Sequence, residues 1–178
     1  PVGPAAEPIE SDTADQDDRQ PVPADVAKRL LRVFRVELVL SYVLIAGLGP
    51  VLPHVLERVG IEADWRAALG ATWMLSRVAV FIFFERWHGW HGRIRTVLWS
   101  SVLLVVGVTG AGLGLSAWSV IVSLALLGVG MGAAYAGALY YAMHAGGDHV
   151  NEGGRHEAAI GLGYTIGPLL ALLISLAF

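Results

Sequence analysis

The sequence contains no cysteine and only one lysine among its 178 residues. Without cysteine the chain has no disulfide framework, no thiolate zinc site and no cysteine nucleophile. Charged residues are also scarce, at 15% of the chain, whereas a typical soluble domain has about 25%. The net charge of −3 provides no basic surface of the kind that binds nucleic acid. We therefore expect no nucleic-acid partner, no metal and no cofactor.

One long stretch has no acidic or basic residue at all. No Asp, Glu, Lys or Arg occurs between Thr96 and Gly147, and the mean hydropathy of the chain is +0.60. A helix needs about 20 apolar residues to cross a bilayer, so this stretch predicts two membrane spans. The remaining apolar runs predict three more, which makes the fold class an all-α polytopic membrane protein embedded in a lipid bilayer. The five spans are expected at about 36–56, 66–85, 95–113, 117–142 and 158–178.

The first 26 residues differ from the rest of the chain. They are rich in Pro, Asp, Glu and Ala, and seven of the fifteen acidic residues lie in the first 25 positions. Such a stretch buries too little apolar surface to offset the entropy of ordering, so we expect a disordered linker at 1–26 before a helical bundle at 27–178. Basic residues at helical spacing from Lys28 to Arg35 predict an amphipathic entry into the first span. The start without Met and the apolar end at Phe178 predict a piece of a longer protein.

Basic residues are distributed unequally between the two sides of the predicted bundle. The richer side of a membrane protein is normally cytoplasmic, so the linker and the loop at 83–93 are expected inside the cell. The composition, with eleven Arg and abundant Ala, suits a bacterial inner membrane. One side carries Lys28, Arg29, Arg32, Arg35, Arg86, Arg93, Arg95 and Arg155, and the other carries Arg58 and Arg66.

Arg77 and Glu37 are the ionisable residues of the predicted spans that are candidates for a role in transport. Arg77 is near the middle of the second span, eight residues or about 12 Å from Glu85. A charge at this depth costs about 2.5–3.5 kcal/mol, so Arg77 must face a cavity or a partner. It is a candidate for binding an anionic solute or for pairing with a proton-coupling carboxylate, and the alternative is a structural ion pair with another helix. Glu37, at the inner end of the first span, is a candidate for proton coupling or for an interfacial ion pair with Arg35.

Three further patterns carry a family resemblance. The loop after the second span reads E-R-W-H-G-W-H-G-R, and the fourth span is rich in glycine. Gly154, expected in the loop before the fifth span, and Gly163, Gly167 and Pro168 within that span follow the spacing G-x8-G-x3-G-P. Together with the acidic linker and the basic entry helix, these patterns resemble the C-terminal half of a major facilitator superfamily transporter, from the central linker through helix eleven.

The resemblance implies secondary active transport of a small-molecule solute by alternating access, in which two six-helix bundles rock about a site near the midplane. The chain would supply five helices of one six-helix half-bundle, with the N-terminal half as its missing partner. Glu85, Arg86 and Arg93 match the family's cytoplasmic loop motif, although extra residues intervene and Phe81 stands at the position of the leading glycine. The alternative is an ordinary basic loop at the inner surface.

The resemblance also implies which side chains line the solute cavity and which let the helices approach closely or bend. For the small residues the alternative is plain helix packing. The cavity candidates are Tyr42, Trp73, Arg77, Met131 and Tyr135. The gating loop would also include Arg155 and Glu157. The packing and hinge candidates are Gly47, Gly49, Pro50, Pro53, Gly128, Gly132, Gly163, Gly167 and Pro168.

Two other chemistries receive little support from the sequence. His88 and His91 are three residues apart, but no third ligand of the usual type is nearby. Ser116 lies in a motif similar to that of intramembrane proteases, yet His144 and His156 are expected on the opposite side of a bilayer about 30 Å thick. We therefore expect no enzyme activity. The alternative to a transporter is a five-span structural or accessory subunit that binds partner helices and transports nothing.

Overall fold

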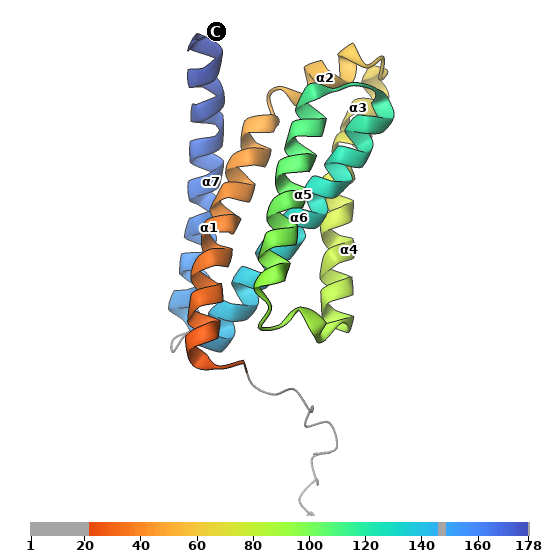
Figure 1. Ribbon diagram of the computed structural model, residues 1–178. Helices are drawn as coiled ribbons and strands as arrows, with labels where there is room; N and C mark the ends of the chain where they lie inside the picture. The colour runs from red at the N-terminus through yellow and green to blue at the C-terminus, as the bar shows by residue number, and fades with distance from the viewer. Residues whose placement is uncertain (1–21, 146–148, 178) are drawn as a thin grey trace, which may run out of the picture.

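The structure is a computed structural model that describes residues 22–145 and 149–177. Over these residues the chain folds into α-helices and one short 3-10 turn, without a strand (Figure 1). Residues 1–21 of the predicted linker lie outside the described part, while Ala24 to Val26 already belong to the first helix. The elements are α1 (Ala24–Leu48), α2 (Leu52–Arg58), α3 (Ala63–Gly70), α4 (Thr72–Arg86), η2 (His88–Trp90), α5 (Ile94–Leu113), α6 (Ala117–Ala145) and α7 (His149–Ala177).

Several of these helices are long and apolar enough to cross a membrane. Four segments meet this test in the described chain: the α3–α4 segment, α5, α6 and α7. A fifth is added if α1 and α2, which are bent by 53° at their junction, count as one broken span. The protein is therefore an all-helical membrane-type bundle with four or five possible spans.

The bend between α1 and α2 has a local cause. α1 ends at Leu48, and the turn that follows contains Gly49 and Pro50. Proline has no backbone N–H to continue the helix, and its ring clashes with the preceding turn. Pro53 then lies at the start of α2, where a missing donor is tolerated. The first apolar run, expected as one span at 36–56, is thus divided about two thirds of the way along its length.

α6 forms the centre of the bundle and packs against α5, α4 and α1. Close approach requires glycine at several of its buried positions. A side chain at Gly128 would overlap the backbone of Trp73 in α4, and one at Gly137 would overlap the ring of Phe34 in α1. Gly132 faces α4 in the same way, with a β-carbon there only 3.0 Å from the side chain of Val80.

α7 packs mainly against α1, so helices from the two ends of the described chain lie side by side (Figure 1). Small residues make this contact possible. A β-carbon at Gly167 would lie 2.6 Å from the carbonyl oxygen of Val43, and one at Gly47 would lie 3.4 Å from that of Gly167. A β-carbon at Gly163 would overlap the side chain of Tyr42. Pro168, which directly follows Gly167, lies inside α7.

The start of α7 differs from the sequence expectation. The expected loop between the last two spans is largely helical, because α6 continues to Ala145 and α7 begins at His149 rather than near Ala158. Gly154, expected in that loop, lies within α7. The acidic residue in the first turn of α7 is Glu152, where a carboxylate is favoured by the helix dipole, while Glu157 lies further along the helix.

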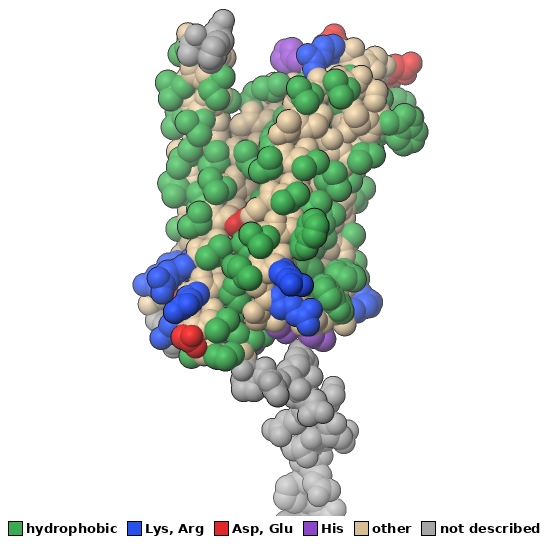
Figure 2. Space-filling view, viewed as in Figure 1, with side chains coloured by type: hydrophobic (Ala, Val, Ile, Leu, Met, Phe, Trp, Pro, Cys, Tyr) green, Lys and Arg blue, Asp and Glu red, His purple; other side chains and the backbone are tan. Residues whose placement is uncertain are grey.

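The two ends of the bundle differ in charge. The start of α1, the α4–α5 connection, the end of α6 and the start of α7 lie at one end, and α2 and α3 lie at the other (Figure 1). Basic side chains gather at the first end, while the body between the ends presents mostly hydrophobic side chains (Figure 2). This distribution is typical of a bundle whose middle faces lipid and whose ends face water.

Candidate functional site

Arg77 lies in the second turn of α4 and is surrounded by aromatic rings. Its guanidinium carbon is 4.5 Å from the ring centroid of Tyr135, 5.3 Å from that of Phe81 and 5.6 Å from that of Tyr42. These distances are within the range of cation–π attraction, which is worth about 2 kcal/mol or more per ring where water is excluded. The rings come from α6, α4 and α1, so three helices contribute to the surroundings of one charge.

α7 completes this cluster. The ring of Tyr164 lies 5.0 Å from that of Tyr42, and the ring of His156 lies 4.6 Å from that of Tyr135, both edge to face. We call Tyr42, Arg77, Phe81, Tyr135, His156 and Tyr164 the Arg77 cluster. It joins one cation, four aromatic rings and one imidazole from α1, α4, α6 and α7.

Polar groups of the Arg77 cluster retain unused hydrogen-bonding capacity. The side-chain Nε of Arg77 and the Nε2 of His156 are buried and have no hydrogen-bond partner in the described structure. No carboxylate of a described residue forms an ion pair with Arg77. A buried donor without an acceptor costs about 1–3 kcal/mol, and aromatic faces do not replace an acceptor in the guanidinium plane. The cluster is therefore chemically suited to accept an anion or another acceptor.

A pocket of about 530 Å³ adjoins the Arg77 cluster between the end of α4, η2 and the end of α6. Phe81 and Tyr135 belong both to this pocket and to the rings around Arg77. We call it the aromatic pocket, and its size is within the range of small-molecule sites. Its other ring-bearing residues are Phe84, His88, Trp90, His91, Tyr140 and His144.

Ring stacking organises the wall of the aromatic pocket. Tyr140 stacks on His91 at 4.1 Å and on His144 at 3.9 Å, and Trp90 meets Tyr140 edge to face at 5.0 Å. The buried Tyr141 fixes the neighbouring turn, because its hydroxyl oxygen accepts a hydrogen bond of 2.7 Å from the backbone N–H of Gly92. Gly92 has a φ of +69°, a conformation that glycine adopts without strain.

No family model, no curated protein and no solved structure matches this chain. The function has to be argued from the arrangement of its residues.

The predicted cavity residues fall into two groups. Tyr42, Arg77 and Tyr135 meet in the Arg77 cluster. Met131 is 1% exposed and packs in the core formed with α1 and α5, while Trp73 lies partly buried at the edge of that core, with its backbone against Gly128. Phe81, His156 and Tyr164 were not among the candidates, because nothing in their local sequence indicates that α4, α6 and α7 meet there.

Glu37 is not paired with Arg35, and the alternative of an interfacial ion pair between them is wrong. Its side chain is buried between α1 and α5, where its Oε1 accepts hydrogen bonds of 2.6 Å from Ser100 and 2.8 Å from Ser101. Its Oε2 is buried and has no hydrogen-bond partner in the part of the chain that the structure describes. Ser100 also contacts the carbonyl oxygens of Thr96 and Val97. Glu37 thus contributes to the α1–α5 contact and does not belong to the Arg77 cluster.

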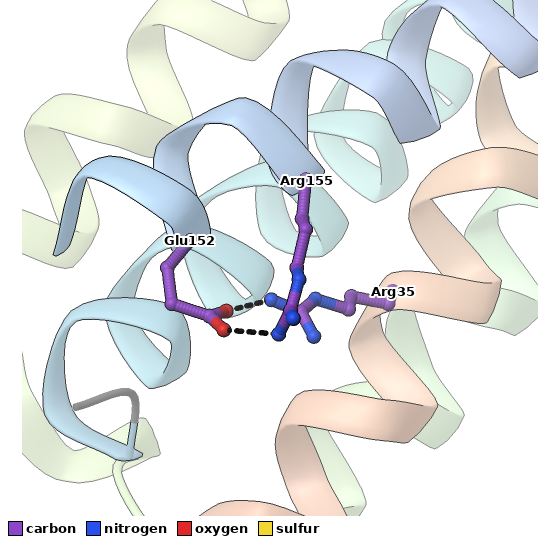
Figure 3. Close-up of polar contacts among 3 residues, drawn as sticks. All are labelled: Arg35, Glu152 and Arg155. Carbon is purple, nitrogen blue, oxygen red and sulfur yellow. Dashed lines mark hydrogen bonds and ion pairs between the residues drawn. The ribbon is translucent and has the colours of Figure 1, made fainter. Parts of the chain in front are cut away.

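Arg35 instead pairs with Glu152 of α7, a residue that the sequence analysis missed (Figure 3). The same carboxylate accepts a hydrogen bond of 2.8 Å from Arg155, one helical turn further along α7. Figure 3 shows the two arginines reaching Glu152 from α1 and α7. The i,i+3 spacing of Glu152 and Arg155 would have indicated half of this network if the segment had been recognised as helical.

The other predicted gating residues do not form a network. Arg86 donates to the carbonyl oxygen of Ile82, a contact within its own helix, and Glu85 lines the rim of the aromatic pocket. Among the described side chains no ion pair joins Glu85, Arg86, Arg93 and Glu157 to one another. The ring centroids of His88 and His91 lie 5.6 Å apart. In the described segments, no group of three or more His, Asp or Glu residues is arranged to hold a metal ion.

Proposed function

We propose that this chain forms one helical half of a secondary active transporter for a small organic anion, working by alternating access in a bacterial inner membrane. The Arg77 cluster is the solute site in this proposal, and the aromatic pocket leads to it from the end of the bundle that carries most of the basic residues. The second half-bundle is supplied by another segment or chain.

The observation that carries the proposal is the aromatic enclosure of Arg77 in the middle of a possible span. A charge at this depth is costly, so intramembrane arginines usually face a binding site or a partner. Here three rings lie within 5.6 Å of the guanidinium carbon, and the Nε has no acceptor among the described residues. An anionic solute would supply an acceptor for this Nε, which has none among the described residues.

The position of the cluster also supports a moving solute. Its residues come from four helices, and α7 is held mainly by α1. Side chains on separately packed helices change their spacing when one helix tilts, which alternating access requires. The ion pair between Arg35 and Glu152 joins α1 and α7 near the same end as the aromatic pocket, where a contact that opens and closes would control entry.

A structural or accessory subunit is the second candidate. The α3–α4 segment and α7 are long and apolar, but only 6% and 11% of their spanning windows are buried within the described chain, compared with 56% for α6. Such helices are covered by lipid or by the helices of a partner. If the partner supplies an acidic residue to Arg77, the cluster is a helix–helix contact and not a solute site.

Uptake into proteoliposomes that contain the protein at its natural length tests the proposal. We expect saturable uptake of at least one member of a panel of small aromatic and aliphatic carboxylates, and none of the matching neutral amides. Arg77→Gln should lower the uptake efficiency about 10- to 100-fold, the range for losing one hydrogen bond to a charged group. Arg77→Lys, which keeps the charge, should retain part of it.

Arg58→Gln is the matched control. It removes the same charge from the other end of the bundle, where Arg58 donates to the carbonyl oxygen of Leu113 at 2.8 Å. An equal loss of uptake in both variants would contradict the role of Arg77. Absence of uptake for every anion, together with copurification of partner helices that depends on Arg77, would favour the accessory subunit.

A further inference from the structure

A groove that shares no lining residue with the Arg77 cluster lies between α4 and α5 and reaches α6. It has a volume of about 350 Å³ and is lined by residues of α4, of the turn after it, of α5 and of α6. We call it the α4–α5 groove. Its deep part is apolar, with Val80, Leu103, Val129 and Ala133 in the lining.

One end of the groove is basic. Arg93 and Arg95 both line it, and both side chains are exposed. Neither guanidinium takes part in an ion pair with another described residue. From Arg95 to Leu103 is eight residues, or about 12 Å along the helix, so one continuous hollow passes from two positive charges into an apolar interior.

Tryptophans stand where the basic end meets the apolar part. Trp87 and Trp99 line the groove and are 47% and 68% exposed. Tryptophan favours the headgroup level of a bilayer, where its ring contacts lipid chains and its N–H contacts polar groups. Their presence places the two arginines at the depth of lipid phosphates and the apolar part at the depth of acyl chains.

A second hollow lies on the other flank of the same residues. It has a volume of about 360 Å³ and is lined by Arg95, Leu98, Trp99 and Val102. Arg95 and Trp99 thus form a ridge between two adjacent hollows, since both belong to each lining. This arrangement matches a molecule with one anionic head and two apolar chains.

We propose that the α4–α5 groove and the neighbouring hollow bind one anionic phospholipid. Its phosphate is held by Arg93 and Arg95, since a guanidinium pairs with phosphate through parallel N–H donors. One acyl chain lies in the α4–α5 groove and the other in the second hollow, on either side of the Arg95–Trp99 ridge. Basic pockets between helices on the cytoplasmic side of membrane proteins bind anionic lipids on the same physical principle.

Other basic residues at this end have, in the described part of the chain, no apolar hollow beside them that could hold an acyl chain. Lys28, Arg29 and Arg32 of α1 are exposed, but they line none of the hollows that contain Arg93 or Arg95. They attract anionic lipid only through the general surface potential. They therefore provide a control in which the same charge is removed without altering the groove.

Quenching of tryptophan fluorescence by brominated lipid tests the proposal. The whole protein is reconstituted in phosphatidylcholine vesicles, and brominated phosphatidylglycerol is titrated in. Quenching should saturate at a low mole fraction of the anionic lipid, and this saturable component should be lost in the Trp87→Phe/Trp99→Phe variant, in which four tryptophans remain. Arg93→Gln/Arg95→Gln should weaken binding about 100-fold or more, since each lost hydrogen bond between a guanidinium and the phosphate is worth about tenfold or more.

Three comparisons decide the outcome. Arg29→Gln/Arg32→Gln should weaken binding less than fivefold, and an equal effect of both double variants would overturn the proposal in favour of a diffuse surface charge. Equal quenching by brominated phosphatidylcholine would also overturn it, because the headgroup charge would then be irrelevant. Displacement of the lipid by millimolar inorganic phosphate would identify a site for a soluble anion, whereas undiminished quenching supports a lipid site.

Discussion

Replacing Glu152 by glutamine should weaken the attachment of α7 to α1. In the wild-type protein the Glu152 carboxylate is hydrogen-bonded and ion-paired to Arg35 of α1 and to Arg155 of α7 (Figure 3). Glutamine has nearly the same size and can still accept a hydrogen bond, but it carries no charge. The substitution therefore removes the attraction and leaves the packing in place.

The expected size of the effect follows from the exposure of the three side chains. Glu152 is 8% exposed, Arg35 is 25% exposed and Arg155 is 66% exposed. Breaking a fully buried ion pair costs about 3–5 kcal/mol, whereas an exposed pair is worth about 0–1 kcal/mol. Since Arg35 keeps some access to solvent and Arg155 keeps most of its own, we expect a loss of about 1–3 kcal/mol, nearly all of it from Arg35.

Unfolding in mixed micelles of a mild detergent and dodecyl sulfate, followed by circular dichroism, measures this free energy. Glu157→Gln is the matched control, because Glu157 is exposed on the same helix and pairs with none of the described basic residues. It should change the free energy of unfolding by less than about 0.5 kcal/mol. In a double-mutant cycle, Arg35→Gln and Glu152→Gln should couple by about 1–2 kcal/mol, within the usual range for contacting residues.

Two results would contradict a charged attachment: the same effect of Glu152→Gln and Glu157→Gln, or additive losses in the double-mutant cycle. Either result would mean that α7 is held to α1 by its small-residue packing alone.

Substitutions at Gly128 and at Glu37, each compared with a second variant, test the packing around α6 and α1. Gly128→Ala should lower the free energy of unfolding by about 1–3 kcal/mol, because the added β-carbon would overlap the backbone of α4. Gly153→Ala is the control: Gly153 has open space around it, so this variant should be neutral or slightly stabilising in the same unfolding assay. Glu37→Gln should lower the free energy of unfolding by less than about 1 kcal/mol, because an amide oxygen still accepts hydrogen bonds from Ser100 and Ser101. Glu37→Ala should lower it by about 1–3 kcal/mol, because it leaves a void and unpaired groups. Equal losses in the two variants would contradict this account.

The helical membrane-type fold could be predicted because its signal is local. A run without charge from Thr96 to Gly147 is long enough for two helices whatever their partners, and α5 and α6 occupy that run. The start of α7 could not be predicted in the same way. Gly153 and Gly154 favour a loop locally, but Glu152 pairs with Arg35, 117 residues earlier, and such a contact has no local signature.

In the candidate site, too, the local feature could be predicted and the long-range contacts could not. Arg77 stands out in the sequence because a charge in the middle of an apolar run needs an explanation. Its neighbours do not stand out, since Phe81 and Tyr164 are ordinary residues of apolar helices until the packing of α4, α6 and α7 is known. Glu37 illustrates the opposite error: its nearest basic residue in sequence suggested an ion pair, whereas helix geometry turns its carboxylate toward Ser100 and Ser101 on α5.

The packing of α1 against α7 has a consequence for biosynthesis. These are the first and last of the described helices, and the Arg77 cluster takes Tyr42 from one and His156 and Tyr164 from the other. During synthesis, Arg77 therefore enters the membrane long before its α7 neighbours emerge from the ribosome. Until α7 inserts and finds α1, the guanidinium has only part of its aromatic surroundings and must be sheltered by the translocon, by lipid headgroups or by water. The order of the chain thus makes the insertion of α7 the step that closes the site.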